Sequence, residues 1–125
     1  MFHDFWRALI EAMTAWHQGK LFIEHALTIS HDTLHIIAGL LLWIALGLAL
    51  RRPLPSWRPW LWLFALTLWN EAVDLWVEQW PDPGQQYGEG VKDLLLTMAV
   101  PTIVMLVGRA RPDLFRQRAA TRRRR

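Results

Sequence analysis

The residues of this chain that could do chemistry are histidines and carboxylates at helical spacing. His31 and His35 are spaced i, i+4, so a helix would place both imidazoles on one face. Glu71, Asp74 and Glu78 follow the spacing i, i+3, i+7 and would form a stripe on a second helix. Imidazole and carboxylate groups exchange protons, bind cations and ligate metal ions. The spacing therefore predicts a polar site built between helices.

Three interpretations of this polar cluster stay open at the level of sequence. A site for a ligand or a proton would be built from His35, Asn70, Glu71, Asp74, Lys92 and Asp93. A divalent metal ion, zinc or manganese, would take its ligands from His31, His35, Glu71, Asp74 and Asp93. The third interpretation is structural: Glu71 or Asp74 pairs with Lys92 or His35 and holds helices together. The remaining histidines, His3, His17 and His25, are expected at a membrane interface.

Several other chemistries are excluded by the sequence. The chain has no cysteine, so it offers no thiolate nucleophile and no Cys-ligated metal site. It contains no G-x-S-x-G, P-loop or H-E-x-x-H motif. No cofactor is predicted apart from the divalent metal, and the expected role is non-enzymatic. A small membrane enzyme acting on a lipid-linked substrate is kept as an alternative.

The elements that must position these residues are three apolar stretches, 33–50, 57–80 and 91–107. Hydrophobic residues make up 53% of the 125 positions, which leaves too little polar sequence for the exterior of a soluble domain. A helix over 33–50 would be about 27 Å long, close to the hydrocarbon thickness of a bilayer. The predicted fold is therefore all-α, an integral membrane domain with three transmembrane helices.

Small residues and prolines indicate how these helices pack and end. Gly39 and Gly47 share one face of the first stretch, which allows close approach of another helix. Ala38, Ala45 and Ala49 share a different face of it. The segment PDPGQQYGEG, 81–90, predicts a loop, and Pro101 predicts a kink in the third stretch.

The amino-terminal segment has a different pattern. Apolar residues recur at spacings of three and four over 2–17, which predicts an amphipathic helix ended by Gly19, with 20–30 as a second short segment before an N-cap at Ser30. Such a helix lies either in the membrane interface or against the rest of the protein. The predicted organisation is an amphipathic, interfacial segment 1–31, a transmembrane domain 32–108 and a basic tail 109–125.

Basic residues are concentrated on one predicted side of the membrane. The net charge is +3, and eight of the 14 basic residues lie in the tail 109–125, directly after an apolar stretch. The expected polyanion is therefore anionic lipid and not nucleic acid. The positive-inside rule places the turn 51–58 and the tail in the cytoplasm, and the amino terminus and 81–90 outside. The predicted lipid-headgroup anchors are Arg51, Arg52, Arg58, Arg109, Arg122, Arg123, Arg124 and Arg125.

Glu71 is the deepest of the predicted carboxylates. It precedes Trp80 by about nine residues, which places it roughly 13 Å inside the interface. An acid at that depth costs about 2.5–3.5 kcal/mol on insertion scales. We therefore predict a partner from another helix, with His35 or Lys92 as the leading candidates.

The stretch from Asp32 to Gly108 resembles the VanZ-like small membrane proteins. The resemblance rests on His35 with Gly39, on Glu71 (or Glu78 with Gln79), on Asp82-Pro83-Gly84 and on Asp93. The YjdF-like membrane proteins resemble the chain in the run Asp32-Thr33-Leu34-His35. The chain departs from the VanZ-like pattern at Glu89, where an Arg is usual, and at Thr97 and Val100, which replace Asn and Gly.

The resemblance implies an envelope-associated role of the kind linked to glycopeptide resistance. The leading hypothesis is a multi-pass protein of the bacterial inner membrane, with its amino terminus outside, its carboxyl terminus in the cytoplasm and an outward-facing polar cluster. The alternative in a different class is an accessory subunit of a larger membrane complex, because a bundle with nine tryptophans offers much surface to partner subunits or to a second copy.

Overall fold

The computed structural model describes residues 2–114, and over this range it consists of four helices joined by short turns. The helices are α1 (Phe2–Leu27), α2 (His31–Ala49), α3 (Trp57–Val77) and α4 (Pro83–Ala110). No strand occurs between residues 2 and 114. The predicted all-α class is confirmed.

The start of α2 is fixed by Ser30, as the sequence predicts. Its hydroxyl oxygen accepts a hydrogen bond from the backbone N–H of Thr33 at 3.2 Å, which satisfies one of the free donors of the first turn. The helix ends at Ala49, and Arg51 then takes a left-handed conformation with φ of 51°. This reversal and the prolines that follow it end the helix and turn the chain toward α3.

Helices α2 and α4 are long and apolar enough to span a bilayer. Only 17% of the apolar window of α2 and 28% of that of α4 are buried inside the protein. The core helix of a soluble domain would be mostly buried, so the exposure of these two helices favours a membrane location. α3 is not among the helices that are apolar enough to span a bilayer. Length and composition therefore indicate two helices that could span a membrane and not the predicted three.

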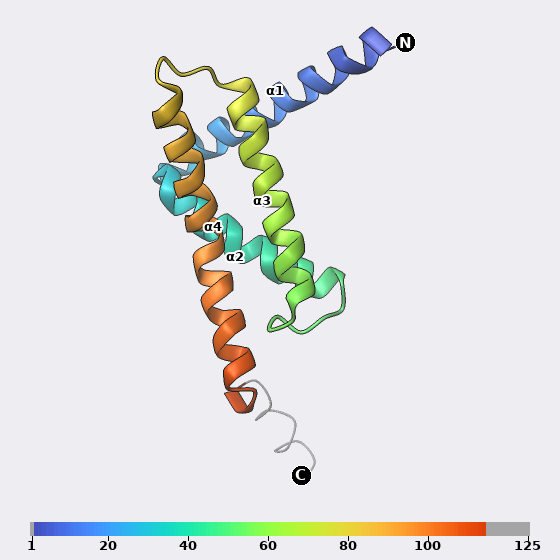
Figure 1. Ribbon diagram of the computed structural model, residues 1–125, viewed down its shortest axis with the longest axis vertical. Helices are drawn as coiled ribbons and strands as arrows, with labels where there is room; N and C mark the ends of the chain where they lie inside the picture. Colours follow the sequence, from blue (N-terminus) through green and yellow to red (C-terminus); the bar gives the residue numbers. More distant parts are fainter. Residues whose placement is uncertain (1, 115–125) are drawn as a thin grey trace.

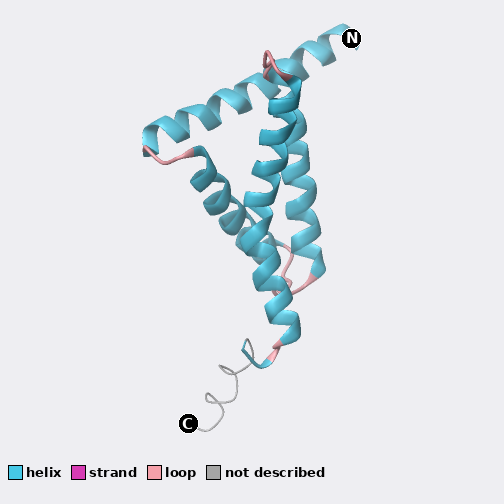
Figure 2. Ribbon diagram, turned by 60° about the vertical axis from the view of Figure 1, so that its left-hand side comes forward, coloured by secondary structure: helices cyan, strands magenta, loops and turns pink. Residues whose placement is uncertain are grey.

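Three helices form the bundle, and α1 lies across one end of it. α3 and α4 run side by side, and α2 packs mainly against α4 and also against α3 (Figures 1 and 2). α1 crosses the end at which α3 stops and α4 begins, and it packs against α3. The turn between α2 and α3 lies at the other end, where the Arg109 guanidinium is 5.3 Å from the centre of the Trp57 ring.

The core of the bundle is small and lies in the half away from α1. Trp43, Leu63, Met98 and Met105 form its buried cluster. One interhelical hydrogen bond lies beside it, donated by the Trp60 indole to the Thr102 hydroxyl at 2.9 Å. Trp60, Phe64 and Leu94 are among the partly buried side chains that pack around it. Many other large apolar side chains of α2 to α4 are exposed on the outside of the bundle.

The prediction that glycines allow close helix packing holds for Gly39. A Cβ atom at Gly39 would lie 2.3 Å from the carbonyl oxygen of Thr97 in α4. Gly47 is also buried, against Leu54 of the following turn. The alanine face of α2 is exposed and makes no comparable contact: Ala38, Ala45 and Ala49.

Two predicted boundaries are wrong. Gly19 does not end the first helix, because α1 continues through it to Leu27. An interior glycine weakens a helix by only about 1 kcal/mol, which the neighbouring residues offset here. The segment 81–90 is not a loop: Asp82 accepts hydrogen bonds from the backbone N–H groups of Gly84 and Gln85, and Pro83 occupies the first turn of α4. An Asp N-cap followed by proline is a helix start, and it overrides the turn character of the glycines.

Candidate functional site

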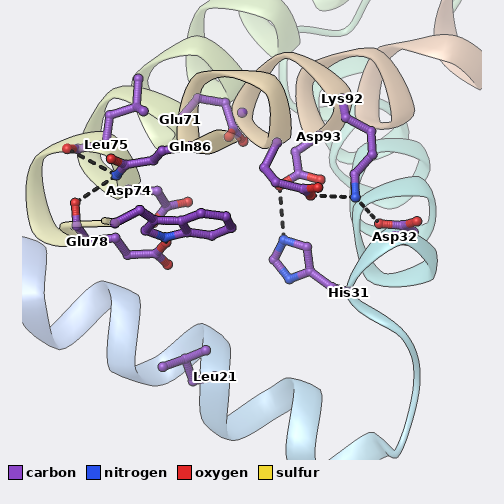
Figure 3. Close-up of a pocket in the computed structure, with 13 residues that line it drawn as sticks. Leu21, His31, Asp32, Glu71, Asp74, Leu75, Glu78, Gln86, Lys92 and Asp93 are labelled. Carbon is purple, nitrogen blue, oxygen red and sulfur yellow. Dashed lines mark hydrogen bonds and ion pairs between the residues drawn. The ribbon is translucent and has the colours of Figure 1, made fainter. Parts of the chain in front are cut away.

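A polar pocket of about 350 Å³ lies at the end of the bundle that α1 crosses. Its walls come from the start of α2, the end of α3 and the start of α4, and Leu21 of α1 lies across from them (Figure 3). The lining is strongly acidic, with one lysine, Lys92, and one histidine, His31, among the carboxylates. These carboxylates are Asp32, Glu71, Asp74, Glu78, Glu89 and Asp93.

One wall of the pocket carries a group that we call the histidine–aspartate group: His31, His35 and Asp93. His31 Nε2 lies 3.0 Å from Asp93 Oδ2, and His35 Nε2 lies 3.6 Å from the same oxygen. The two Nε2 atoms are 3.2 Å apart. The i, i+4 spacing on α2 places both imidazoles on the face that packs against α4, where Asp93 is buried. Figure 3 shows His31 directed at Asp93.

Further polar groups hold the two imidazoles from behind. His35 Nδ1 lies 3.0 Å from the Thr97 hydroxyl, which itself donates to the carbonyl oxygen of Asp93 at 2.8 Å. His31 Nδ1 lies 3.3 Å from Glu24 Oε2, at the end of α1. Each imidazole is therefore oriented through Nδ1, and each presents Nε2 to Asp93.

A second polar group joins α1 to α3, and we call it the lysine group: His17, Lys20, Asn70, Asp74 and Glu78. The Lys20 ammonium contacts both carboxylate oxygens of Asp74 and lies 3.1 Å from Asn70 Oδ1. His17 Nδ1 is 3.1 Å from Asp74 Oδ1, and its Nε2 is 3.4 Å from Glu78 Oε1. α1 therefore supplies partners for Asp74 and Glu78 of the acidic stripe on α3.

The predicted partner of Glu71 is wrong. Glu71 is buried, at 6% exposure, but its Oε1 accepts a hydrogen bond from Asn70 of its own helix at 3.2 Å. Neither candidate partner binds it, because His35 faces Asp93 and Lys92 pairs with Asp32 at 3.0 Å. Lys92 is drawn away by the carboxylates at the rim of the pocket, where it also contacts Glu89 at 2.5 Å.

The five predicted metal ligands are divided between these groups. His31, His35 and Asp93 come together, and their ligand atoms all lie within 4.8 Å of one another. Asp74 belongs to the lysine group, and Glu71 lines the pocket between the two.

Sequence reasoning missed the contribution of α1. His17 is buried at 8% exposure and faces two carboxylates, so it belongs to the polar contacts between α1 and α3, which the sequence analysis did not assign to it. Lys20 contacts Asp74, and Glu24 contacts His31. The signal was their spacing, since His17, Lys20 and Glu24 share one face of a helix. Ending the helix at Gly19 hid that pattern.

The predicted lipid anchors lie at the other end of the bundle as far as the structure describes them. Arg51, Arg52, Arg58 and Arg109 are exposed there. Arg122, Arg123, Arg124 and Arg125 lie outside the described residues.

Comparisons of the chain with protein-family models, with curated proteins and with solved structures give no match. The resemblance to the VanZ-like and YjdF-like proteins therefore stays a prediction. What the chain does has to be inferred from its own geometry.

Proposed function

We propose that the protein is a small integral membrane protein that binds a cation in an acidic pocket open to the outer face of the membrane. The observation that carries this proposal is the pairing of two features. Apolar side chains cover the outside of the helices, and buried carboxylates gather at one end. Buried carboxylates in a bilayer are costly unless cations or donors compensate them.

We propose that α3 is the third membrane-spanning helix. Its 21 residues correspond to a length of about 32 Å, which matches the hydrocarbon core. Leu61, Trp62 and Leu68 are each more than half exposed, so its outward face is apolar. Its carboxylates, Glu71 and Asp74, line the pocket instead of the outer surface.

The distribution of charge supports an orientation for the bundle. The exposed arginines of the α2–α3 turn and Arg109 lie at the end away from α1. The positive-inside rule places that end in the cytoplasm of a bacterial inner membrane. The pocket and α1 then face outward, so a ligand would enter from outside.

The orientation can be tested with single cysteines, because the chain has none of its own. In intact cells, a membrane-impermeant maleimide should label Gln85→Cys on the outer end and should fail to label Pro53→Cys in the turn; both positions are exposed. After the cells are opened, both should react. Labelling of position 53 but not 85 in intact cells would reverse the orientation and remove the proposed function.

Cation binding can be followed through Trp80, which lines the pocket and donates to Glu78 Oε2 at 2.7 Å. In lipid nanodiscs, titration with MgCl₂, CaCl₂, ZnCl₂ or ethanolamine should change tryptophan fluorescence for at least one cation. The change should be lost in Trp80→Phe and weakened in Glu71→Gln, which keeps the shape but removes a charge. A fluorescence signal that no cation alters would contradict cation binding.

A second candidate function is an accessory subunit of a membrane complex. It is favoured by the first turns of α1, which extend beyond the bundle and expose Phe5 and Ile10 at 61% and 48% (Figure 1). Stable co-purification with other membrane proteins in mild detergent would support this role. The envelope role implied by the VanZ-like resemblance has its own test, a changed glycopeptide susceptibility on deletion.

A further inference from the structure

We infer that the histidine–aspartate group is a binding site for a first-row transition metal ion, with Zn²⁺ as the ion of best fit. The inference deepens the proposed function, on which it rests for access from the pocket. The proposed ligands are His31 Nε2, His35 Nε2 and a carboxylate oxygen of Asp93. The rest of the acidic pocket is not needed for it.

The separations between the three ligand atoms match those around a tetrahedral ion. They are 3.0 Å, 3.2 Å and 3.6 Å. In a tetrahedral zinc site with bonds of about 2.0–2.1 Å, ligand atoms lie about 3.3 Å from one another. The three atoms therefore lie close to three corners of a tetrahedron of the size that zinc requires.

The hydrogen bonds behind the imidazoles leave their Nε2 atoms free to coordinate. The Thr97 hydroxyl donates its hydrogen bond to the carbonyl oxygen of Asp93, so it can only accept a hydrogen bond from His35 Nδ1. Glu24 is an acceptor only, so the Nδ1 atom of His31 donates to it. A neutral imidazole protonated at Nδ1 carries its lone pair at Nε2. Metal-bound histidines are held in this way, with the second nitrogen donating to a carboxylate or a neutral oxygen.

Two lone pairs and a carboxylate oxygen then face one another, and a cation between them would stabilise this arrangement. Asp93 is only 9% exposed at its side chain, and its Oδ1 has no hydrogen-bond partner among the described residues. A buried carboxylate oxygen without a partner is strongly unfavourable. A cation at the group would satisfy all three ligands and offer Oδ1 a bond.

The lysine group also contains histidine and carboxylate side chains, but its central carboxylate already has a cationic partner. His17, Asp74 and Glu78 also bring three ligand atoms together. There, however, the Lys20 ammonium already contacts both oxygens of Asp74. That carboxylate is neutralised by a side chain, whereas the partners of Asp93 are imidazoles.

The ligand set selects the ion. Two imidazoles and one carboxylate suit zinc and its first-row neighbours, while calcium and magnesium prefer six or more oxygens. Three protein ligands leave a fourth position, and His31, 47% exposed at its side chain, lies on the pocket side of the group. Water or an external ligand would occupy that position.

Metal binding should be measured on full-length protein in lipid nanodiscs, stripped with EDTA and titrated with ZnCl₂ against a chromophoric chelator. We expect one Zn²⁺ per chain, and CoCl₂ should give the intense visible absorption of tetrahedral Co²⁺. His31→Gln should weaken zinc binding by at least about 100-fold because it removes a ligand, and the protein should remain folded because position 31 is exposed. Thr97→Val removes no ligand and should weaken it about 10–100-fold. His25→Ala, exposed on α1, is the matched control and should bind as the wild type does.

Three outcomes would overturn the inference. They are absence of stoichiometric zinc in the wild type, binding that His31→Gln leaves intact, and binding lost in His17→Ala but kept in His31→Gln. If zinc fails while magnesium or ethanolamine still changes Trp80 fluorescence, the metal site is wrong and the cation pocket stands. If zinc binds at the group but Gln85→Cys is shielded in intact cells, the outward-facing pocket is wrong and the metal site stands.

Discussion

Lys20 and Lys92 each contact two polar partners, but their surroundings differ. Lys20 lies between α1 and α3 and binds Asp74 and Asn70, with its side chain 25% exposed. Lys92 lies at the pocket rim and binds Asp32 and Glu89, with its side chain 41% exposed. An ion pair that water can replace contributes little, whereas a partly buried carboxylate that loses its partner is costly.

We therefore predict that Lys20→Met destabilises the docking of α1 by about 1–3 kcal/mol, because Asp74 would lose its ammonium partner. Lys92→Met should change stability little, because its ion pairs lie at the exposed rim of the pocket. Limited proteolysis in nanodiscs with a glutamate-specific protease measures the difference, since Glu24 is half-buried while α1 is docked and becomes accessible when α1 undocks. Equal protection of α1 in the two variants would contradict this account of the lysine group.

The histidine–aspartate group could be predicted in part at this scale. The i, i+4 pair and the acid near the start of the last apolar stretch are visible as residue types and spacing. What the sequence could not show was which acid meets which base. Glu71, the deepest acid by count, bonds within its own helix, and Asp93 faces the imidazoles. Which acid faces the histidines depends on the rotation of α4 about its own axis relative to α2. The sequence does not indicate this rotation, because both helices carry apolar residues on most of their faces.

At the scale of elements, the contact between α2 and α4 determines the spacing of the site. Gly39 of α2 lies one turn beyond His35 and packs against the Thr97 backbone, four residues beyond Asp93. Any separation of the two helices at this point would also separate the histidines from the aspartate. The helix spans could be predicted within a few residues for α2, because apolar runs between capping signals mark both ends. The bounds of α1 and α4 could not, since Gly19 and the glycines of 84–90 resemble breakers.

We predict that Gly39→Ala destabilises the bundle by about 1–3 kcal/mol, because the new methyl would meet a backbone carbonyl at 2.3 Å and the helices would have to move apart. Gly88→Ala in α4 is the control. Nothing lies within 4 Å of its Cβ position, and it should be neutral or stabilising by up to about 1 kcal/mol. Thermal unfolding in detergent compares them, and a Gly39→Ala variant as stable as Gly88→Ala would show that the close approach is not required.

At the scale of the whole molecule, α1 lies across one end of the bundle, α3 and α4 run along it side by side, and α2 packs obliquely against them (Figure 2). Its contacts with α3 combine the lysine group with a bond from the Trp16 indole to Asn70 at 3.0 Å. Its apolar residues are largely exposed. A helix that uses polar groups to bind its own protein and keeps its apolar residues outward is suited to the lipid interface.

We predict that spin labels on α1 will report two environments in liposomes. A label at Ile10→Cys should be more accessible to oxygen, which concentrates in lipid, and a label at Glu11→Cys to a water-soluble nickel chelate; both positions are exposed. Equal accessibility of both labels to the nickel chelate would place α1 in water and remove the interfacial assignment.

Pro101 has a consequence for how this protein can vary. A proline has no N–H, so the carbonyl of Thr97, four residues earlier, lacks its helical donor, and Gly39 packs on that same oxygen. A Cα–H group of glycine is a weak donor suited to such an oxygen. The Thr97 hydroxyl oxygen, in turn, accepts a hydrogen bond from His35 Nδ1. We therefore expect these four residues to be substituted together, or not at all, in related sequences: His35, Gly39, Thr97 and Pro101. A substitution of one of them alone should be rarer than a substitution on the exposed alanine face of α2.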